Sequence, residues 1–177
     1  MSALHIFTER LDLIAATLEL ARADTSDRAR FTTLLDARLP EEWPPPLNDD
    51  DSARWLVQAL EKGSSADSGW LLWYFVLREN GARVAIGNGG FKGEPVDGTA
   101  EIGYSIVPNY HRRGLGSEAV SALVDWAFSQ SRVTRVIAET LPELEASQGL
   151  LRKLGFCATE ESSEPGIVRF ELHREAV

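Results

Sequence analysis

Hydrophobic and polar positions alternate near the start of the chain and then take a wider, helical spacing. The segment FTERLDL (7–13) leads into AATLELARA (15–23), where the polar Thr17 and Glu19 alternate with leucines. A period of two is typical of a half-buried strand, so we predict one strand here. Asp24–Ala37 carries its apolar residues three to four positions apart and predicts a helix.

A proline-rich stretch, LPEEWPPPLNDD (39–50), interrupts this pattern. Three consecutive prolines cannot enter a helix interior, so the stretch predicts an irregular loop. Apolar residues then recur at helical spacing, which predicts a second helix. Asp51 or Ser52 is expected to cap its start, and Gly63 to end it.

The middle of the chain has the pattern of an antiparallel meander. WLLWYFVL (70–77) is a continuous apolar run, typical of a buried strand. Asn80–Gly81 tolerate positive φ and predict a two-residue hairpin turn. RVAIGNGGF (83–91) is then the return strand, and TAEIGYSIVP (99–108) the next strand of the meander.

The last third mixes helices and strands. Apolar residues at helical spacing predict helices over Leu115–Phe128 and Ala146–Leu154, with TRVIAETL (134–141) as a strand between them. FCATEES (156–162) and GIVRFELH (166–173) predict a closing hairpin.

Together these elements predict a mixed α/β (α+β) fold, a mostly antiparallel sheet of about seven strands with helices on both faces. The strand–helix–strand piece from Glu101 to Leu141 must be a right-handed parallel crossover if both strands share a sheet. A length of 177 residues predicts a single domain over 1–177.

Composition excludes several classes of partner. The net charge of −9, from 18 basic and 27 acidic residues, argues against nucleic-acid binding. No apolar run approaches the roughly 20 residues of a membrane helix, and the N-terminus lacks a signal pattern, so we expect a cytoplasmic protein without membrane contact. The single cysteine, Cys157, excludes an internal disulfide and a cysteine zinc cluster, and we expect it to be buried. His5, His111 and His173 have no metal-ligand spacing, so no metal site is expected.

Gly114-Leu115-Gly116 lies between a predicted strand and the start of a predicted helix. Glycines let the backbone approach a ligand, and the first N–H groups of a helix have no internal partner and carry partial positive charge. Together they favour a phosphate-binding cradle, to which Arg112 and Arg113 add charge and Ser117 a hydroxyl donor.

The same glycines also fit a dinucleotide site. GLGSEA (114–119) matches G-x-G-x-x-G/A, and Glu139 follows where a ribose-binding acid would lie. Three features oppose this reading. Pro108–Arg113 separate the strand from the glycines, the strand before them alternates polar and apolar residues, and a meander precedes it where a doubly wound fold has βαβ units. No P-loop lysine and no G-x-S-x-G elbow follow.

The stretches AEIGYSIVPNYHRRGLGSEAV (100–120) and RVIAETLPELEASQGLLRKLGF (135–156) resemble the GNAT superfamily of acetyl-CoA-dependent N-acetyltransferases. The likeness is greatest to the ribosomal-protein N-terminal acetyltransferase-like group, and it extends to TERLDL (8–13). It implies a splayed parallel strand pair at the CoA site, where backbone N–H groups near Ile106 and Val107 meet the pantetheine and polarise the thioester oxygen.

The family motif Gln/Arg-x-x-Gly-x-Gly/Ala, whose backbone amides hold the CoA pyrophosphate, aligns with His111-x-x-Gly114-x-Gly116. His111 thus stands where the family has Gln or Arg. The resemblance implies a cofactor-binding segment made of His111, Arg112, Arg113, Gly114, Leu115, Gly116 and Ser117. In the last helix, the family's general-acid tyrosine is replaced by Leu151, and Asn-x-x-Ser becomes Leu144-x-x-Ser147.

Attack of an amine on a thioester needs a base that deprotonates the ammonium, a site that stabilises the tetrahedral oxyanion, and a way for the thiolate to leave. Strand alternation puts Glu101 beside Gly103, facing a cleft, so Glu101 is our preferred base, with a purely substrate-binding role as the alternative. Glu139 is the second candidate. Ser147 is the predicted proton donor on the last helix, with Tyr104 or Tyr110 as weaker candidates.

The sequence therefore predicts an acetyl-CoA-dependent N-acetyltransferase that acts on a primary amine, either a peptide N-terminus or a small molecule. The chain is also expected to be able to form a homodimer. The absence of the family tyrosine at Leu151 leaves open a non-catalytic acyl-CoA sensor. An NAD(P)-binding oxidoreductase is the third reading. Trp43, Trp70 and Trp73 are expected in the core, with Trp43 alternatively at the acceptor site.

Overall fold

One eight-stranded sheet organises the computed structural model, which describes residues 3–63 and 69–175. Its strands are β1 (His5–Phe7), β2 (Leu11–Ala15), β3 (Leu72–Glu79), β4 (Ala82–Phe91), β5 (Thr99–Ile106), β6 (Arg135–Thr140), β7 (Cys157–Thr159) and β8 (Val168–His173). The helices are α1 (Leu18–Ser26), α2 (Arg28–Leu35), α3 (Asp50–Lys62), α4 (Leu115–Ser129) and α5 (Glu145–Lys153), with a short 3-10 turn η2 (Pro108–Tyr110) before α4.

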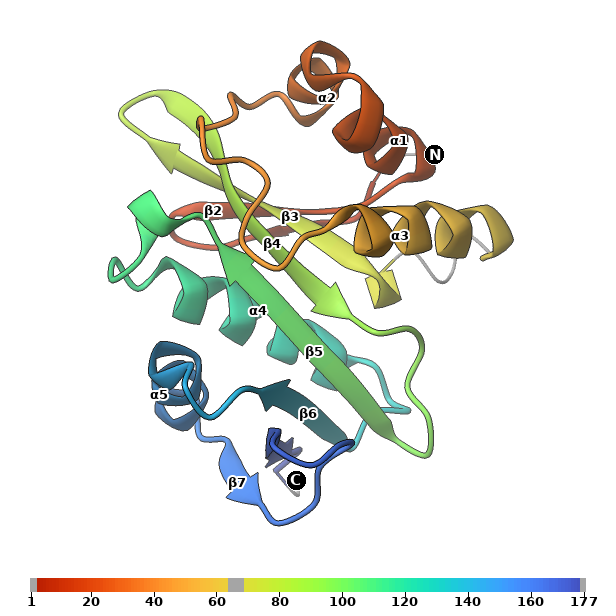
Figure 1. The fold of residues 1–177 in the computed structure, drawn as a ribbon, viewed down its shortest axis with the longest axis vertical. Coiled ribbons are helices and arrows are strands. Elements are labelled where there is room, and N and C mark those ends of the chain that lie inside the picture. Colours follow the sequence, from red (N-terminus) through yellow and green to blue (C-terminus); the bar gives the residue numbers. More distant parts are fainter. Residues whose placement is uncertain (1–2, 64–68, 176–177) are drawn as a thin grey trace.

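The strand order is β1-β2-β3-β4-β5-β6-β8-β7, and every neighbouring pair except β5–β6 is antiparallel (Figure 1). β5 and β6 pair in parallel only from Thr99–Ile102 against Arg135–Ala138, and beyond these residues the two strands separate. The predicted mixed sheet, its parallel crossover and its splayed strand pair are therefore confirmed. The meander before α4 also removes the doubly wound arrangement that a dinucleotide site needs.

Two apolar cores lie on opposite faces of the sheet, as strand alternation requires. Trp73 and Phe75 of β3 point into the core covered by α4 and α5, whereas Tyr74 and Val76 point into the core covered by α1, α2 and α3. In Figure 1, α4 passes behind β5 while α3 lies in front of the sheet. Helices on both faces are thus confirmed.

The N-terminal segment differs from the prediction. A hairpin, β1–β2, stands where we predicted one strand, and the chain then forms α1 over residues that alternate in sequence. The Thr17 side chain accepts a hydrogen bond from Leu20 N at 3.2 Å and starts the helix. Leu20, Ala21 and Ala23 pack into the second core, so cap and tertiary burial outweigh the local alternation. The extra strand β1 makes eight strands instead of about seven.

The boundaries of α3, α4 and α5 were predicted within a few residues. The helix predicted over Asp24–Ala37 is two helices, because Asp27 ends α1 and caps α2. α3 is capped by Asp49, which accepts from Ser52 N at 2.8 Å, rather than by Asp51 or Ser52 themselves. Gly63 ends α3 as predicted.

The hairpin at Asn80–Gly81 is confirmed, since both residues have positive φ, 52° and 74°. Cys157, in contrast, is exposed. It lies on β7, the last strand of the sheet, so the prediction that it is buried was wrong. Across residues 3–63 and 69–175 no helix is both long and apolar enough to cross a membrane.

Candidate functional site

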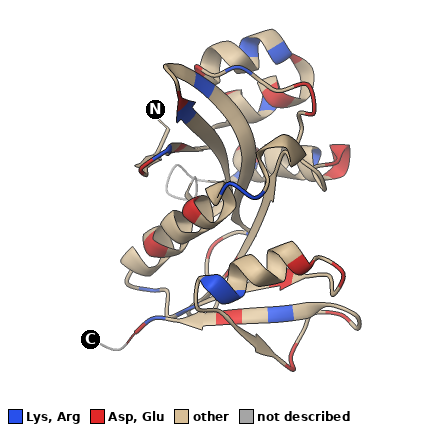
Figure 2. Cartoon of the chain, turned by 90° about the vertical axis from the view of Figure 1, so that its left-hand side faces the viewer, with Lys and Arg blue, Asp and Glu red and all other residues tan. Residues whose placement is uncertain are grey.

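The loop before α4 is shaped by two residues in the left-handed region, Arg112 (φ 58°) and Gly114 (φ 76°). α4 begins directly after Gly114. Among the residues that the structure describes, no side chain caps the first turn of this helix. The N–H groups of its first residues are therefore free to bind an anion. A Cβ on Gly116 would lie 3.1 Å from Leu150 Cδ1, so a glycine here lets α4 approach α5. Figure 2 shows the basic loop at the start of α4.

The two arginines of this loop differ in their contacts. Arg113 Nη2 lies 2.5 Å from Glu79 Oε1, and its guanidinium carbon stands 5.6 Å from the centre of the Tyr110 ring. Arg112 is exposed and makes no hydrogen bond or ion pair with the residues that the structure describes. Arg112 is thus the more available cation for an anionic ligand.

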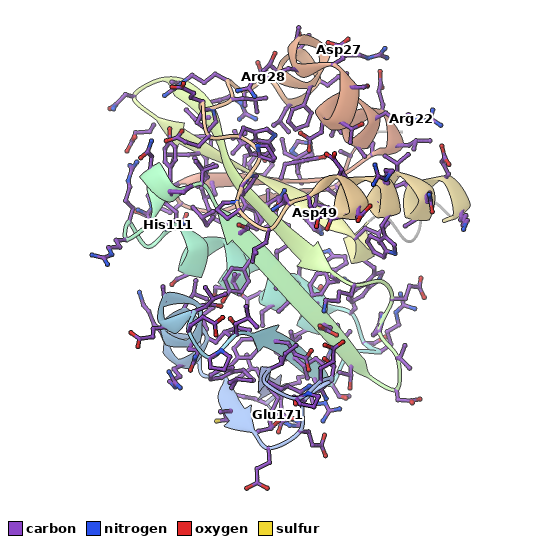
Figure 3. All side chains as sticks on the ribbon, in the orientation of Figure 1. Arg22, Asp27, Arg28, Asp49, His111 and Glu171 are labelled. Carbon is purple, nitrogen blue, oxygen red and sulfur yellow. The ribbon has the colours of Figure 1, made fainter. Side chains whose placement is uncertain are left out.

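His111 is tied to the neighbouring strand (labelled in Figure 3). Its Nε2 lies 2.7 Å from the carbonyl oxygen of Ile106, and since a carbonyl can only accept, Nε2 carries the proton. Its backbone N–H donates to Pro108 O at 3.0 Å. The imidazole at the family's Gln/Arg position therefore joins η2 to the end of β5. Neither the Nε2–H nor the backbone N–H of His111 is free to bind an anion.

The splay leaves one edge of β5 unpaired beyond Ile102. Val107 N donates to Ile86 O of β4 at 2.8 Å, so its N–H is not available to a ligand. Because N–H directions alternate along an antiparallel strand, the amides of Tyr104 and Ile106 face the open edge. Of the two amides predicted to meet pantetheine, only that of Ile106 is suitably directed.

Glu101 lies on the opposite face of β5 from Tyr104 and forms an ion pair with Lys92. A Cβ on Gly103, two residues along the same face, would meet no atom within 4 Å. Ser105 bounds this open space, and its Oγ donates to Pro46 O at 2.6 Å. Glu101 therefore lies on the same face of β5 as the exposed Gly103, roughly 16 Å along the strand from Ile106.

Ser147, in the first turn of α5, is brought to Tyr104. The two hydroxyl oxygens are 3.0 Å apart. Burial raises the pKa of the Tyr104 phenol above its ordinary value, although the hydrogen bond with Ser147 acts in the opposite direction. Leu151, at the position of the family tyrosine, is fully buried in the core. A phenol from β5 thus stands beside the serine, a pairing that sequence spacing could not reveal.

Glu139 has no freedom to act as a base. It accepts from Ser163 N at 2.8 Å, from Ser163 Oγ at 2.5 Å and from Arg169 Nε at 3.0 Å. Burial by itself raises the pKa of Glu139, but the hydrogen bonds from Ser163 and Arg169 outweigh it and hold the pKa below 4.5. Glu139 is an ion-paired structural carboxylate.

The proline loop covers part of the Glu101 face. Asn88 of β4 is 4% exposed and donates Nδ2 to Asn48 Oδ1 at 2.8 Å, which holds the loop over β4. Trp43 is buried and donates Nε1 to Asp24 Oδ1 at 2.8 Å, so its predicted place in the core is confirmed. Burial raises the pKa of Asp24, against the hydrogen bonds from Trp43 and Tyr74.

Comparison with known proteins agrees with this geometry. A family model described as an acetyltransferase (GNAT) domain matches residues 17–157. The chain is 29% identical over 160 residues to YjdG of Bacillus subtilis strain 168, named an uncharacterized N-acetyltransferase, covering 89% of this chain and 92% of YjdG.

Two solved structures share the fold. The ribosomal-protein-S5-alanine acetyltransferase of Vibrio fischeri has a TM-score of 0.64 at 18% identity, covering 96% of both chains. RimL, the ribosomal L7/L12 alpha-N-protein acetyltransferase, solved in complex with coenzyme A, has a TM-score of 0.61 at 18% identity, covering 96% of this chain and 98% of RimL. Since the family model spans most of its length, the chain belongs to the GNAT family of N-acetyltransferases.

Proposed function

We propose that the protein transfers an acetyl group from acetyl-CoA to a primary amine by direct attack of the amine on the thioester. The observation that carries the proposal is the uncapped start of α4, which follows a loop with two left-handed residues and lies beside the splayed edge of β5. RimL, a structural neighbour, was solved with CoA, which supports the same class of donor here.

In this proposal the pyrophosphate of CoA binds the first amides of α4. Leu115, Gly116 and Ser117 supply N–H groups, and Arg112 supplies the charge. The pantetheine arm then runs along the open edge of β5, where the Ile106 N–H is directed toward the splay.

The chemistry follows from the groups around that edge. The Ile106 N–H is placed to donate to the oxygen that gains charge as the amine attacks the carbonyl carbon. The C–S bond then breaks, and the thiolate leaves on the α5 side, where Ser147, hydrogen-bonded to Tyr104, can return a proton. A thiol has an ordinary pKa near 8.5, so the leaving group needs only modest help, and Leu151 does not prevent turnover.

The acceptor amine approaches from the opposite face, through the open space above Gly103. Glu101 borders this space, and because it lies roughly 16 Å along the strand from Ile106, it receives the ammonium proton through a chain of water molecules, while Lys92 pairs with one of its oxygens. The acceptor is a peptide N-terminus or a small-molecule amine.

Calorimetry with CoA and a thiol-release assay with acetyl-CoA test the proposal together. We expect saturable CoA binding by the wild type and a large loss in Gly114→Val, because a β-branched residue is strained at φ 76°. Amines and N-terminal peptides then identify the acceptor by thiol release. Glu101→Gln is expected to lower turnover and alter its pH profile while CoA binding stays intact.

Two results would contradict this function. Absence of CoA binding by the wild type would contradict the proposed donor site. CoA binding without thiol release across the whole amine panel would instead favour a non-catalytic acyl-CoA sensor.

A further inference from the structure

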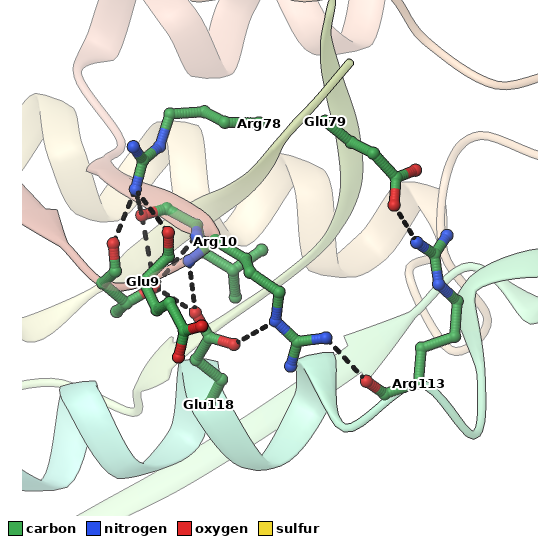
Figure 4. Close-up of polar contacts among 8 residues, drawn as sticks. Glu9, Arg10, Arg78, Glu79, Arg113 and Glu118 are labelled. Carbon is green, nitrogen blue, oxygen red and sulfur yellow. Dashed lines mark hydrogen bonds and ion pairs between the residues drawn. The ribbon is translucent and has the colours of Figure 1, made fainter. Parts of the chain in front are cut away.

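The turn between β1 and β2 contacts the first turn of α4, which lies 108 residues later in the chain (Figure 4). Glu118, the fourth residue of α4, accepts from Thr8 Oγ1 at 2.6 Å, from Arg10 N at 2.7 Å and from Arg10 Nε at 2.7 Å. Burial by itself raises the pKa of Glu118, but these hydrogen bonds outweigh it and hold the pKa below its ordinary value. An ionised carboxylate thus joins the N-terminal turn to the helix that opens the donor site.

The same arginine also reaches the loop. Arg10 Nη1 donates to the carbonyl oxygen of Arg113 at 2.9 Å, and Nη2 lies 3.5 Å from the position that a Cβ on Gly114 would occupy. One planar guanidinium therefore spans two elements, the helix through Glu118 and the loop through Arg113.

This contact has a directional consequence for the anion site. A trans peptide is planar, and its C=O and following N–H point in opposite directions. Holding the Arg113 carbonyl toward Arg10 therefore turns the Gly114 N–H away from Arg10. The peptide group that is fixed in this way lies between the two left-handed residues of the loop, Arg112 and Gly114.

The turn that carries Arg10 is itself anchored to the sheet. Arg78 of β3 donates through Nη2 to Thr8 O at 2.6 Å and to Leu11 O at 3.2 Å, and its backbone N donates to Arg10 O at 2.9 Å. Through Arg10, the loop before α4 is therefore held in a fixed position relative to β3. A surface ion pair between Arg113 and Glu79 adds a second, more exposed tether from β3.

We propose that Arg10 is a positioning residue of the donor site, which holds the Arg112–Gly114 loop and the start of α4 in the geometry that binds the CoA pyrophosphate. The inference rests on the proposed acetyl-CoA function and adds to it a role for the TERLDL stretch, which lies far from the glycine motif in sequence.

The test compares Arg10→Ala, Arg10→Ala combined with Glu118→Gln, and Arg22→Ala. Arg22 pairs with Glu61 at 2.6 Å between α1 and α3, so it is a matched arginine–glutamate control away from the loop (Figure 3). Each protein is titrated with CoA by calorimetry. Each is also assayed with acetyl-CoA and with S-acetyl-N-acetylcysteamine, an acyl donor that lacks the pyrophosphate.

We expect Arg10→Ala to raise the Kd for CoA by about tenfold or more, because the loop is then no longer held in the binding geometry and must be ordered when CoA binds. Its kcat/KM with the truncated donor should remain at the wild-type value, which a general loss of folding could not produce. If Arg10 acts through the loop carbonyl, removing the Glu118 charge in the double variant will not restore CoA binding.

Three results would overturn the inference. The first is a Kd for Arg10→Ala equal to that of Arg22→Ala, and the second is an equal loss of activity with both donors. The third is full recovery of CoA binding in the double variant, which would mean that Arg10 only neutralises the charge of Glu118. Failure of the wild type itself to bind CoA is a separate outcome, because it would overturn the proposed function first.

Discussion

Single residues on β5 separate the donor side of the site from the acceptor side. Tyr104 faces Ser147 and the α4–α5 core, whereas Glu101, Gly103 and Ser105 face the proline loop. In the proposed function, the alternation that predicted a strand therefore also places the two substrates on opposite faces. Gly103 matters because the space above it is empty of protein atoms.

We predict that Gly103→Val impairs acceptor use and spares donor binding. A Cβ at this position meets no atom within 4 Å, and a β-branched residue suits a strand, so the protein should remain folded. It fills the proposed acceptor space, and kcat/KM for the best amine should fall by about tenfold or more. Steady-state kinetics and CoA calorimetry measure the two effects.

Gly149→Ala is the matched control, because its Cβ also meets no atom within 4 Å but lies on α5. Unchanged kinetics of Gly103→Val with every amine would place the acceptor elsewhere.

At the scale of elements, one carboxylate adds side-chain contacts to the antiparallel pairing that joins the C-terminal strands to β6. Glu139, the penultimate residue of β6, binds both Arg169 of β8 and Ser163 of the β7–β8 connection. Sequence position alone made it a candidate base or ribose ligand. Its neighbours come from residues 24 to 30 positions away, so only the folded sheet reveals that its lone pairs are occupied.

Glu139 should make stability depend on pH. Its pKa in the folded protein lies below 4.5, its ordinary value, so its contribution to the free energy of unfolding is present above that value. The contribution is lost as the pH falls through the lower, folded-state pKa. Glu139→Gln should therefore have a lower Tm than the wild type near neutral pH, and the difference should shrink as the pH falls below the ordinary pKa of a glutamate.

Thermal unfolding across this range tests the prediction. Glu160→Gln, an exposed glutamate of the same connection, serves as the control. Parallel Tm curves for Glu139→Gln and the wild type would contradict the assigned ion pair.

At the scale of the whole molecule, the two faces of one sheet contribute side chains to two separate cores. β3 sends Trp73 and Phe75 to the α4–α5 side and Tyr74 to the α1–α3 side, so neither core can be lost without exposing apolar side chains of shared strands. In the proposed function, the loop before α4 binds the donor and the acceptor approaches from the other face of this common sheet. Their relative position is therefore set by the same packing that stabilises the fold.

We predict that both cores unfold in one cooperative transition. Phe31→Ala and Leu123→Ala each remove a fully buried side chain, one from each core, and each should lower the free energy of unfolding by about 2–5 kcal/mol. Circular dichroism and tryptophan fluorescence should give coincident denaturation curves for both variants. Separate transitions in Phe31→Ala would show that the α1–α3 side unfolds independently.

Local pattern was a reliable guide where short-range forces decide. The Asn80–Gly81 turn, α4 with Gly114 before it, and the end of α3 at Gly63 were all predicted, because turn chemistry and helical amphipathicity act over a few residues. α1 was missed for the opposite reason. Its sequence alternates, and burial against the second core selects the helix.

The sequence by itself determined the class of fold, the family and the proposed anion-binding loop, since these follow from periodicity and from a contiguous motif. Only the tertiary structure decided the state of individual groups. In the folded protein His111 is hydrogen-bonded to a carbonyl, and Glu139 and the Val107 N–H already have hydrogen-bond partners. Ser147 pairs with Tyr104, and Arg10 contacts the loop before α4. Each of these depends on hydrogen bonds whose partners are set by packing rather than by spacing in the chain.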